Sequence, residues 1–394
     1  MKVLVINSGS SSIKYQLMEM PSEKVICEGI IERIGSKKAV LKYKRGNISI
    51  EEEEEILTHT IGLKKIAAFL LDSKKGVITD VKEIDAVGHR VVHGGNVYSK
   101  TTIVNQGVKE KINEYSILAP LHNPHNLEGI VLAEQIFNTA HQVAVFDTAF
   151  HQTIPTKAKK YAIPNELYTN HGIQVYGFHG TSHKYVSEKA IDYLQNPEAK
   201  IISIHLGNGC SITAVKNGKS VDHSLGFTPS NGLIMGSRSG DIDHSIIFHF
   251  VKTLGYDLDK VEKILLKKSG MLGLTGYSDL RDVQSGAEQG NTDCILALEM
   301  NAYRIKKYIG AYAAIMNGLD AILFTAGIGE NSSVLRELVC SDMDYLGINL
   351  DQEKNKLKSN SLRDISISSS KVKIFVIPTN EELEIAKQVF QLVR

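Results

Sequence analysis

The sequence predicts an α/β protein built from two related halves. Predicted strands and helices alternate along the whole chain, which is typical of α/β architecture. Residues 3–15 and 201–213, about half a chain apart, each contain an apolar strand, a glycine-rich turn and a second strand. The 394 residues also exceed one ordinary domain, since domains usually contain roughly 100–200 residues. We therefore expect two duplicated domains that flank a central cleft.

The first hairpin begins with the apolar run Val3–Ile6 and turns at Asn7–Lys14. Ile13, Tyr15 and Leu17 then alternate with polar residues, so the turn joins two antiparallel strands. A Walker A loop leads from a strand into a helix, and that interpretation therefore fails here.

The turn of this hairpin is a candidate phosphate site. Its backbone N–H groups, the hydroxyls of Ser10 and Ser12 and the ammonium of Lys14 can point at one anion. Asn7 adds an amide oxygen at the strand end, where Mg²⁺ or its waters would sit. The alternative is an ordinary Ser/Gly hairpin loop.

Strand and helix patterns alternate between the two hairpins. The acidic run Glu51–Glu55 indicates a solvated helix start or an exposed edge. We expect buried strands over Ala86–Val92 and Val143–Phe146 and helices over Leu127–Phe137 and His183–Leu194.

The second half continues the alternation after the hairpin whose return strand is Ser211–Val215. The expected elements are a helix over Thr292–Asn317, a strand over Ala321–Thr325, a turn over Gly327–Asn331, a helix from Ser332, a strand over Lys373–Ile377 and a helix over Glu381–Val393.

The composition excludes several classes of protein. The chain has 42% hydrophobic residues, 23% charged residues and a net charge of +1. This net charge is too small to attract nucleic acid or a membrane surface through the electrostatic field of the whole protein. No signal segment precedes the first strand, so we expect a cytoplasmic protein. Polar residues interrupt the apolar stretch Ile309–Ile328, which argues against a membrane helix.

The scattered cysteines Cys27, Cys210, Cys294 and Cys340 suit buried thiols better than disulfides or a metal site.

Two further glycine-rich turns are candidate nucleotide sites. His205–Gly209 repeats the first hairpin turn, and its glycines allow phosphates to approach the backbone. Thr325–Asn331 lies between a strand and a helix, where N–H groups can meet a ligand. It lacks the third glycine of a dinucleotide fingerprint, so a tight strand-to-helix turn is the alternative.

Charged residues beside strand ends and glycines are candidates for catalysis. Arg90 and Arg238 lie among glycines and offer rigid forks for a carboxylate or a phosphoryl group. Asp147 ends an apolar strand, where α/β sites collect, although a capping role is equally plausible. His179 and His183 lack an evident third metal ligand. We expect His179 to donate to an oxyanion, and Thr181 or Ser182 to cap the helix that follows.

Six segments resemble the motifs of the acetate kinase family, in order and over the full length. They are Asn7–Lys14, Gly177–His183, His205–Gly209, Met235–Asp243, Thr325–Asn331 and Thr379–Glu382. The resemblance implies two RNase-H-like domains of the actin-like ATPase superfamily, with residues 1–149 and 383–394 in the first and 150–382 in the second. It also implies a homodimer.

Carried over by motif, the resemblance implies a role for each candidate residue. Asn7 and Glu381 would hold Mg²⁺, or Mn²⁺ in its place. Arg90 would bind the carboxylate of the substrate, Asp147 would be the acid/base residue, and His179 and Arg238 would stabilise the transition state. The acyl tail would lie against Val92, Leu121, Phe178 and Pro229. The nucleotide and its phosphates would be bound by Ser10, Ser12, Lys14, His205, Leu206, Gly207, Asn208, Gly209, Asp279, Leu280, Arg281, Gly327, Ile328, Gly329, Glu330 and Asn331.

The implied reaction is reversible transfer of a phosphoryl group from ATP to acetate, which gives acetyl phosphate and ADP. A protein that catalyses such a transfer chiefly positions the reactants and neutralises charge, so direct in-line transfer is expected. A simple carboxylic acid, with a pKa of about 4, is already ionised at neutral pH and needs no general base. Asp147 would then orient Mg²⁺ or the substrate.

Two other functions stay open at this point. A propionate or butyrate kinase would use the same residues, and one methylene in an apolar pocket is worth only about 1–3 kcal/mol. An actin-like or chaperone-type ATPase would act as a binding protein, but the chain has no appended peptide-binding region, and two arginines suit a small anionic acceptor.

The sequence departs from the family at four places. The segment Thr275–Asp279 is one residue shorter than usual, which leaves the base contacts open, and Ser237 replaces a common threonine. His125 and His244 stand where small residues or proline are usual, and the sequence assigns them no role.

Overall fold

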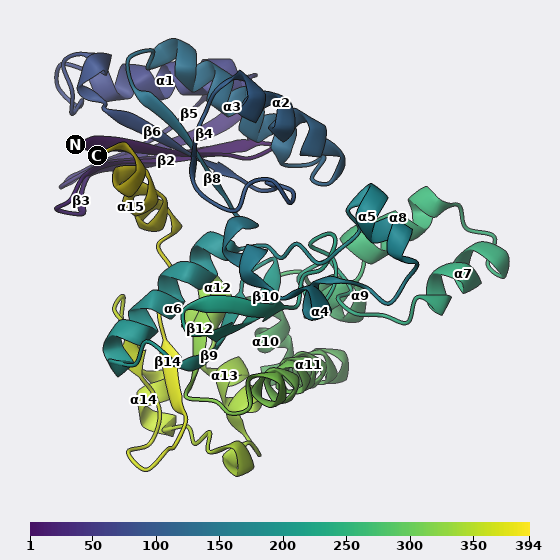
Figure 1. Ribbon diagram of the computed structural model, residues 1–394. Coiled ribbons are helices and arrows are strands. Elements are labelled where there is room, and N and C mark those ends of the chain that lie inside the picture. Colours follow the sequence, from purple (N-terminus) through teal and green to yellow (C-terminus); the bar gives the residue numbers. More distant parts are fainter. The chain divides into compact units, whose positions relative to one another are not determined.

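The computed structural model describes all residues from 1 to 394. The chain forms two compact units, which are residues 1–150 together with 380–394, and residues 151–379 (Figure 1). The start of the last helix, with Glu381, therefore belongs to the first unit. No helix in either unit is both long enough and apolar enough to cross a membrane.

The first unit contains an eight-stranded sheet in the order β5-β4-β3-β2-β1-β6-β8-β7. The strands are β1 (Lys2–Ser8), β2 (Ser12–Glu19), β3 (Lys24–Glu32), β4 (Ser36–Arg45), β5 (Ile48–Ile56), β6 (Ala86–Val91), β7 (Thr102–Ile103) and β8 (His141–Phe146). β1 pairs antiparallel with β2 and parallel with β6, and β6 pairs parallel with β8. The carboxyl ends of β1, β6 and β8 therefore lie at one edge of the sheet.

Helices cover both faces of this sheet. They are α1 (His59–Leu71), α2 (Gln106–Glu114), α3 (Asn123–Ile136) and α15 (Glu381–Val393), with 3-10 turns at Val81–Glu83 and Tyr115–Ile117. Figure 1 shows α1, α2 and α3 along one face and α15 on the other. α15 contacts β1, β6 and β8, so the end of the chain supports the central strands.

The core of the first unit forms where the sheet meets α1 and α3. Leu4, Ile6 and Tyr15 of β1 and β2 are buried in one cluster with Leu63 and Phe137. Full burial of such a side chain contributes about 1.5–3 kcal/mol.

The acidic run Glu51–Glu55 lies in β5, which is the outermost strand of the sheet. Its interpretation as an exposed edge is therefore confirmed, and its interpretation as a helix start is wrong.

The second unit contains a six-stranded sheet in the order β11-β10-β9-β12-β14-β13. The strands are β9 (Lys200–Leu206), β10 (Cys210–Lys216), β11 (Lys219–His223), β12 (Ala321–Thr325), β13 (Arg363–Asp364) and β14 (Lys373–Val376). β9 pairs antiparallel with β10 and parallel with β12, and β12 pairs parallel with β14. This repeats the pattern of β2, β1, β6 and β8, so the predicted α/β class and its internal duplication are confirmed.

The second unit contains eleven helices. They are α4 (Thr156–Lys159), α5 (Asn165–His171), α6 (Gly180–Leu194), α7 (Ser245–Lys252), α8 (Leu258–Lys267), α9 (Gly270–Thr275), α10 (Leu280–Glu288), α11 (Thr292–Met316), α12 (Ala326–Asn331), α13 (Ser333–Cys340) and α14 (Gln352–Lys356). The 3-10 turns are Ala149–Thr153 and Asp344–Leu346. Figure 1 shows α6 and α11 on opposite faces, and α7 and α8 away from the sheet.

Two local predictions in the second unit are wrong. α6 begins at Gly180, and its N-cap is His179 in the left-handed region (φ 56°), so neither Thr181 nor Ser182 is the capping residue. The glycine-rich turn over residues 327–331 folds as the short helix α12, because Ala326 adopts a positive φ of 64° and the chain coils directly after β12. Ser332 then caps α13, close to the expected helix start.

All four cysteines are free and buried. This confirms the prediction of buried thiols.

Candidate active site

Four of the predicted site residues of the first unit meet at the carboxyl edge of its sheet. Asn7 lies near the end of β1, Arg90 near the end of β6, and Asp147 directly after β8. Glu381 is the first residue of α15. Parallel neighbours end at the same edge, which is where α/β proteins collect functional side chains.

Arg90 and Asp147 form the centre of this group. Arg90 Nε donates to both carboxylate oxygens of Asp147 at 3.1 Å, and Nη2 donates to Oδ2 at 2.6 Å. The Asp147 side chain is 2% exposed. A fork-to-carboxylate pair of this kind fixes both side chains in one orientation.

Asn7 and Glu381 approach the same guanidinium. Asn7 Oδ1 accepts from Arg90 Nη1 at 3.4 Å, and Glu381 Oε2 lies 3.8 Å from Arg90 Nε. Burial alone would lower the pKa of Arg90, but Asp147 and Glu381 outweigh burial and raise it. Burial raises the pKa of Glu381, although Arg90 opposes that shift. Three oxygen-bearing side chains thus surround one cation.

The first hairpin turn lies beside this group. Asn7 pairs with Lys14 across the two strands, and Gly9 N–H donates to the carbonyl of Ser12 at 2.8 Å. Ser10 is exposed and Ser12 half-buried. Lys14 Nζ lies 2.7 Å from Glu382 Oε1 and stays more than half exposed. Hydroxyls and an ammonium are therefore available to an anion at this turn.

Two asparagines that sequence reasoning missed hold the loop after Arg90. Asn123 accepts from His93 N–H at 3.0 Å, and Asn126 accepts from Val92 N–H at 3.1 Å. Asn126 also donates to the carbonyl of Ser8 at 2.7 Å. Both are buried at the start of α3. The run Asn123-Pro-His-Asn126 at a helix start was the available signal.

The four residues expected around an acyl tail differ in burial. Val92 is buried in the first unit, and Phe178 is buried in the second. Pro229 is half-buried, and its carbonyl accepts from Arg238 Nη1 at 2.6 Å. Leu121 is 60% exposed.

In the second unit, two glycine-rich segments meet at the corresponding edge of the sheet. Gly207 N–H donates to the carbonyl of Gly209 at 3.1 Å in the turn between β9 and β10. His205 pairs with Thr325 across β9 and β12, so the 207–209 turn and α12 follow neighbouring parallel strands. The buried residues Leu206 and Ala326 connect these strands to the two segments.

His179 and Arg238 converge over Gly209. A Cβ placed on Gly209 would lie 3.6 Å from His179 Nε2 and 3.7 Å from Arg238 Nη2. His179 Nδ1 is held by the hydroxyl of Ser211 at 2.9 Å, and its ring stacks on His205 at 4.3 Å between centroids. Burial lowers the pKa of Arg238, although its shift is opposed by Cys210. The two side chains can meet one anion above the turn.

A group of buried histidines supports His179. His183 Nε2 bonds to the same Ser211 hydroxyl at 2.7 Å. The rings of His151, His183 and His223 contact one another. Burial lowers the pKa of His151 to about 3 and lowers those of His183 and His223 well below the usual value, so all three are neutral.

Arg336, a residue that sequence reasoning missed, holds the short helix α12 through hydrogen bonds to its backbone. Arg336 is 2% exposed, and its Nη1 donates to the carbonyls of Gly329 and Glu330 at 2.8 and 3.1 Å. Asn331 Nδ2 donates to the carbonyl of Gly327 at 2.8 Å, and Ile328 is half-buried. Nothing in the sequence around Arg336 indicates the carbonyl groups to which its buried side chain donates.

The remaining nucleotide candidates lie at the start of α10. Asp279 is its N-cap, and Arg281 Nε donates to Asp279 Oδ1 at 3.0 Å. The hydrogen bonds from Arg281 lower the pKa of Asp279 to about 2. Leu280 is buried, whereas the Arg281 side chain is 88% exposed. Asn208 lies against Gly236, where a Cβ would come within 2.3 Å of its Oδ1.

Comparison with known proteins gives full-length matches. The sequence model of the acetokinase family matches residues 2–387. Acetate kinase of Flavobacterium johnsoniae is 64% identical over 392 residues, with 100% of this chain and 99% of that protein covered. Acetate kinase of Thermotoga maritima is 53% identical over 398 residues, with the same coverage.

Solved structures agree with these matches. The crystal structure of Porphyromonas gingivalis acetate kinase is 44% identical, covers 100% of both chains and superimposes with a TM-score of 0.94. The crystal structure of a propionate kinase from Francisella tularensis is 43% identical, covers 98% of both chains and has a TM-score of 0.92.

Proposed function

The chain belongs to the acetokinase family, and on that premise we propose that it transfers a phosphoryl group from ATP to acetate, giving acetyl phosphate and ADP. The reaction is reversible, because acetyl phosphate carries a transferable phosphoryl group and ADP can accept it. Full-length identity of 64% to an acetate kinase supports acetate as the acceptor.

The observation that carries this proposal is the group around Arg90 at the edge of the first sheet. Arg90 is fixed by Asp147 and faces Asn7 and Glu381. A guanidinium held in this way is suited to a carboxylate or to the phosphoryl group that the carboxylate receives. Val92, Leu121, Phe178 and Pro229 remain the proposed contacts of the acyl tail.

The nucleotide side of the reaction is assigned to the second unit. The turn over residues 207–209, α12 and the start of α10 supply glycines and N–H groups for ATP. His179 and Arg238 would neutralise charge on the transferring phosphoryl group, since both reach the space above Gly209. Ser10, Ser12 and Lys14 would contact the phosphates from the first hairpin turn.

Mg²⁺, or Mn²⁺ in its place, fits the oxygen ligands of the first unit. Asn7, Asp147 and Glu381 offer one amide and two carboxylate oxygens, and Mg²⁺ is usually held by one or two carboxylates together with substrate phosphates. When bound, the ion would neutralise charge on the phosphates of ATP.

Asp147 would orient Arg90 and not act as a base. Its carboxylate already accepts three hydrogen bonds from Arg90, and acetate is ionised at neutral pH. The acetate oxygen would attack the γ-phosphorus directly, and ADP would leave on the opposite side. Labelled ATP should therefore leave no phosphorylated residue that reacts onward with acetate; a competent phosphoenzyme would contradict direct transfer.

We extend the proposal to the architecture and the setting of the enzyme. The two units would be the two RNase-H-like domains of this family, and their shared strand order supports that assignment. The active protein would be a cytoplasmic homodimer whose partners are ATP, ADP, a short-chain carboxylate and its acyl phosphate.

The proposal is tested with a panel of acids. The purified chain is incubated with Mg²⁺ and ATP plus acetate, propionate or butyrate, and acyl phosphate is trapped with hydroxylamine. We expect acetate to give the highest kcat/KM. A propionate preference would favour the other acceptor seen among the similar structures, and ATP hydrolysis without any acyl phosphate would refute the kinase assignment.

A further inference from the structure

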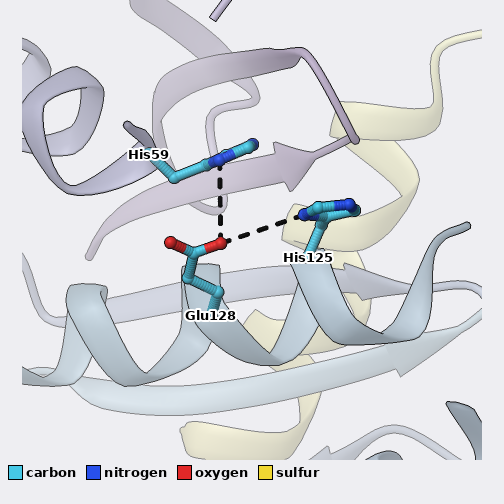
Figure 2. Close-up of side chains that lie close together, drawn as sticks. All are labelled: His59, His125 and Glu128. Atoms are coloured by element: carbon cyan, nitrogen blue, oxygen red, sulfur yellow. Dashed lines mark ion pairs between the residues drawn. The ribbon is translucent and has the colours of Figure 1, made fainter. Parts of the chain in front are cut away.

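Three side chains of the first unit gather beside the turn between β1 and β2, where His59 contacts Gly9. His59 begins α1, and His125 and Glu128 lie on α3, one turn apart. Figure 2 shows both imidazoles directed at the Glu128 carboxylate. Glu128 Oε2 lies 3.7 Å from His59 Nδ1 and 3.9 Å from His125 Nδ1. The three potential ligand atoms all lie within 4.8 Å of one another.

The hydrogen bond made by His59 Nε2 orients its ring. His59 Nε2 lies 2.7 Å from the carbonyl of Gly9, and a carbonyl can only accept, so Nε2 carries the hydrogen. With this hydrogen on Nε2, Nδ1 is the nitrogen left to bind a metal, and it lies on the side of Glu128. Metal-bound histidines commonly donate their second N–H to a backbone carbonyl in this way, which fixes the ring and its tautomer.

We propose that His59, His125 and Glu128 bind a divalent transition metal of the zinc type. Two imidazole nitrogens and one carboxylate oxygen form a ligand set that zinc sites use, with water in the fourth position. Bond lengths of about 2.0–2.1 Å require ligand atoms roughly 3.3 Å apart in a tetrahedral site. His59 is buried, whereas His125 and Glu128 are 33% and 42% exposed, so the latter two have room to close on an ion.

An ordinary surface ion pair does not account for all of this geometry. The rings of His59 and His125 stack, with centroids 5.3 Å apart and planes at 21°. Both Nδ1 atoms lie nearest the same carboxylate oxygen of Glu128. A single metal ion among these three side chains would contact both Nδ1 atoms and the carboxylate together.

The site connects two helices to the phosphate turn. A metal would join the start of α1 to α3, and the His59 hydrogen bond would hold the Gly9 carbonyl in place. Metal binding to the folded chain stabilises it by mass action. The inference depends on this geometry alone and does not rest on the proposed kinase activity.

The test uses the full-length protein after treatment with a chelator. Zn²⁺ is titrated against a colorimetric chelator in excess Mg²⁺, which occupies sites that prefer oxygen ligands, and Co²⁺ is added separately to read coordination from visible absorption. We expect one tight Zn²⁺ per chain, Co²⁺ absorption typical of a four-coordinate site and a higher melting temperature with Zn²⁺.

Variants decide where the metal is bound. Loss of a supporting residue already lowers metal affinity roughly 10–100-fold, so His125→Ala and Glu128→Gln should lower it at least as much and abolish the rise in melting temperature. Glu128→Gln keeps the side-chain shape, which separates loss of a ligand from misfolding. His244→Ala removes a histidine that is 85% exposed in the second unit and should change nothing. Equal Zn²⁺ affinity in wild type, His125→Ala and Glu128→Gln would overturn the proposal.

Discussion

Arg90 and Asp147 are joined by three hydrogen bonds, the shortest of which runs 2.6 Å from Nη2 to Oδ2. The pair lies on two neighbouring parallel strands, because Arg90 is near the end of β6 and Asp147 follows β8. Asp147 is therefore an acceptor that is already occupied, and the guanidinium is fixed in one orientation. We therefore propose that Asp147 positions Arg90 and a cation and does not transfer a proton.

Replacing Asp147 by Asn should lower both stability and turnover. The substitution removes one charge of a buried pair, which typically costs about 3–5 kcal/mol of stability. It also releases Arg90, and loss of a positioned electrostatic group lowers kcat by roughly 10²–10³. Urea unfolding and initial rates at saturating Mg²⁺ measure the two effects. Glu114→Gln, in an exposed pair with Lys111, is the control and should change neither. Near-normal turnover of Asp147→Asn would contradict the account.

Arg238→Ala and Arg281→Ala should separate catalysis from nucleotide binding. Arg238 reaches the space above Gly209, so its loss should lower kcat by roughly 10²–10³ with a smaller rise in the KM for ATP. Arg281 is largely exposed, so its loss should mainly raise that KM. Steady-state kinetics with varied ATP measure both. An unchanged kcat in Arg238→Ala would refute its role in the transition state.

Gly209→Ala should fold normally and lose activity. The added Cβ would sit at ordinary contact distances of 3.5–3.7 Å from His179 and Arg238. It would therefore not strain the protein, but it would occupy the space proposed for a phosphate. We expect a melting temperature close to that of wild type and a KM for ATP at least ~10-fold higher, since ~1.4 kcal/mol corresponds to tenfold. Gly310→Ala, in α11 with open space around it, is the control. Full activity in Gly209→Ala would place the phosphate elsewhere.

Acidification from pH 7 to 5 should destabilise the second unit. Burial lowers the pKa of His151, His183 and His223, so the unfolded chain binds more protons than the folded one below the usual value of 6.5. Each such histidine costs up to about 1.4 kcal/mol of stability per pH unit, a slope that is reached well below pH 6.5. Burial raises the pKa of Asp222 to about 6, and its protonation in the folded state offsets part of the loss. Urea midpoints measured by circular dichroism should fall with pH. A flat profile would mean that these histidines are not buried as neutral groups.

Much of the fold could be predicted because local patterns determine it. The alternation of Ile13, Tyr15 and Leu17 fixed the first hairpin, and its counterpart at His205–Gly209 predicted the second sheet. Local patterns failed at Ala326, whose positive φ turns the chain into α12 directly after β12. They also failed at α6, where His179 occupies the N-cap because Ser211 and His205 hold its ring.

The candidate site could be predicted only where local sequence patterns mark its residues. Arg90, Asp147 and Asn7 were found because strand ends and neighbouring glycines mark them. Arg336, Asn123 and Asn126 were missed because these partners are backbone groups, which the sequence does not mark. Arg336 donates to a carbonyl 7 residues away, and the cited partners of Asn123 and Asn126 lie 30 and 118 residues away. His125 had no assigned role until α1 and α3 brought His59 and Glu128 beside it.

We propose that this protein consumes ATP only by transfer of a phosphoryl group to a carboxylate. The most direct test measures ADP and acetyl phosphate in the same reaction, with Mg²⁺, ATP and acetate, and again without acetate. We expect equal amounts of the two products, and almost no ADP when acetate is omitted. ADP formed at the same rate without acetate, with no acetyl phosphate, would contradict it.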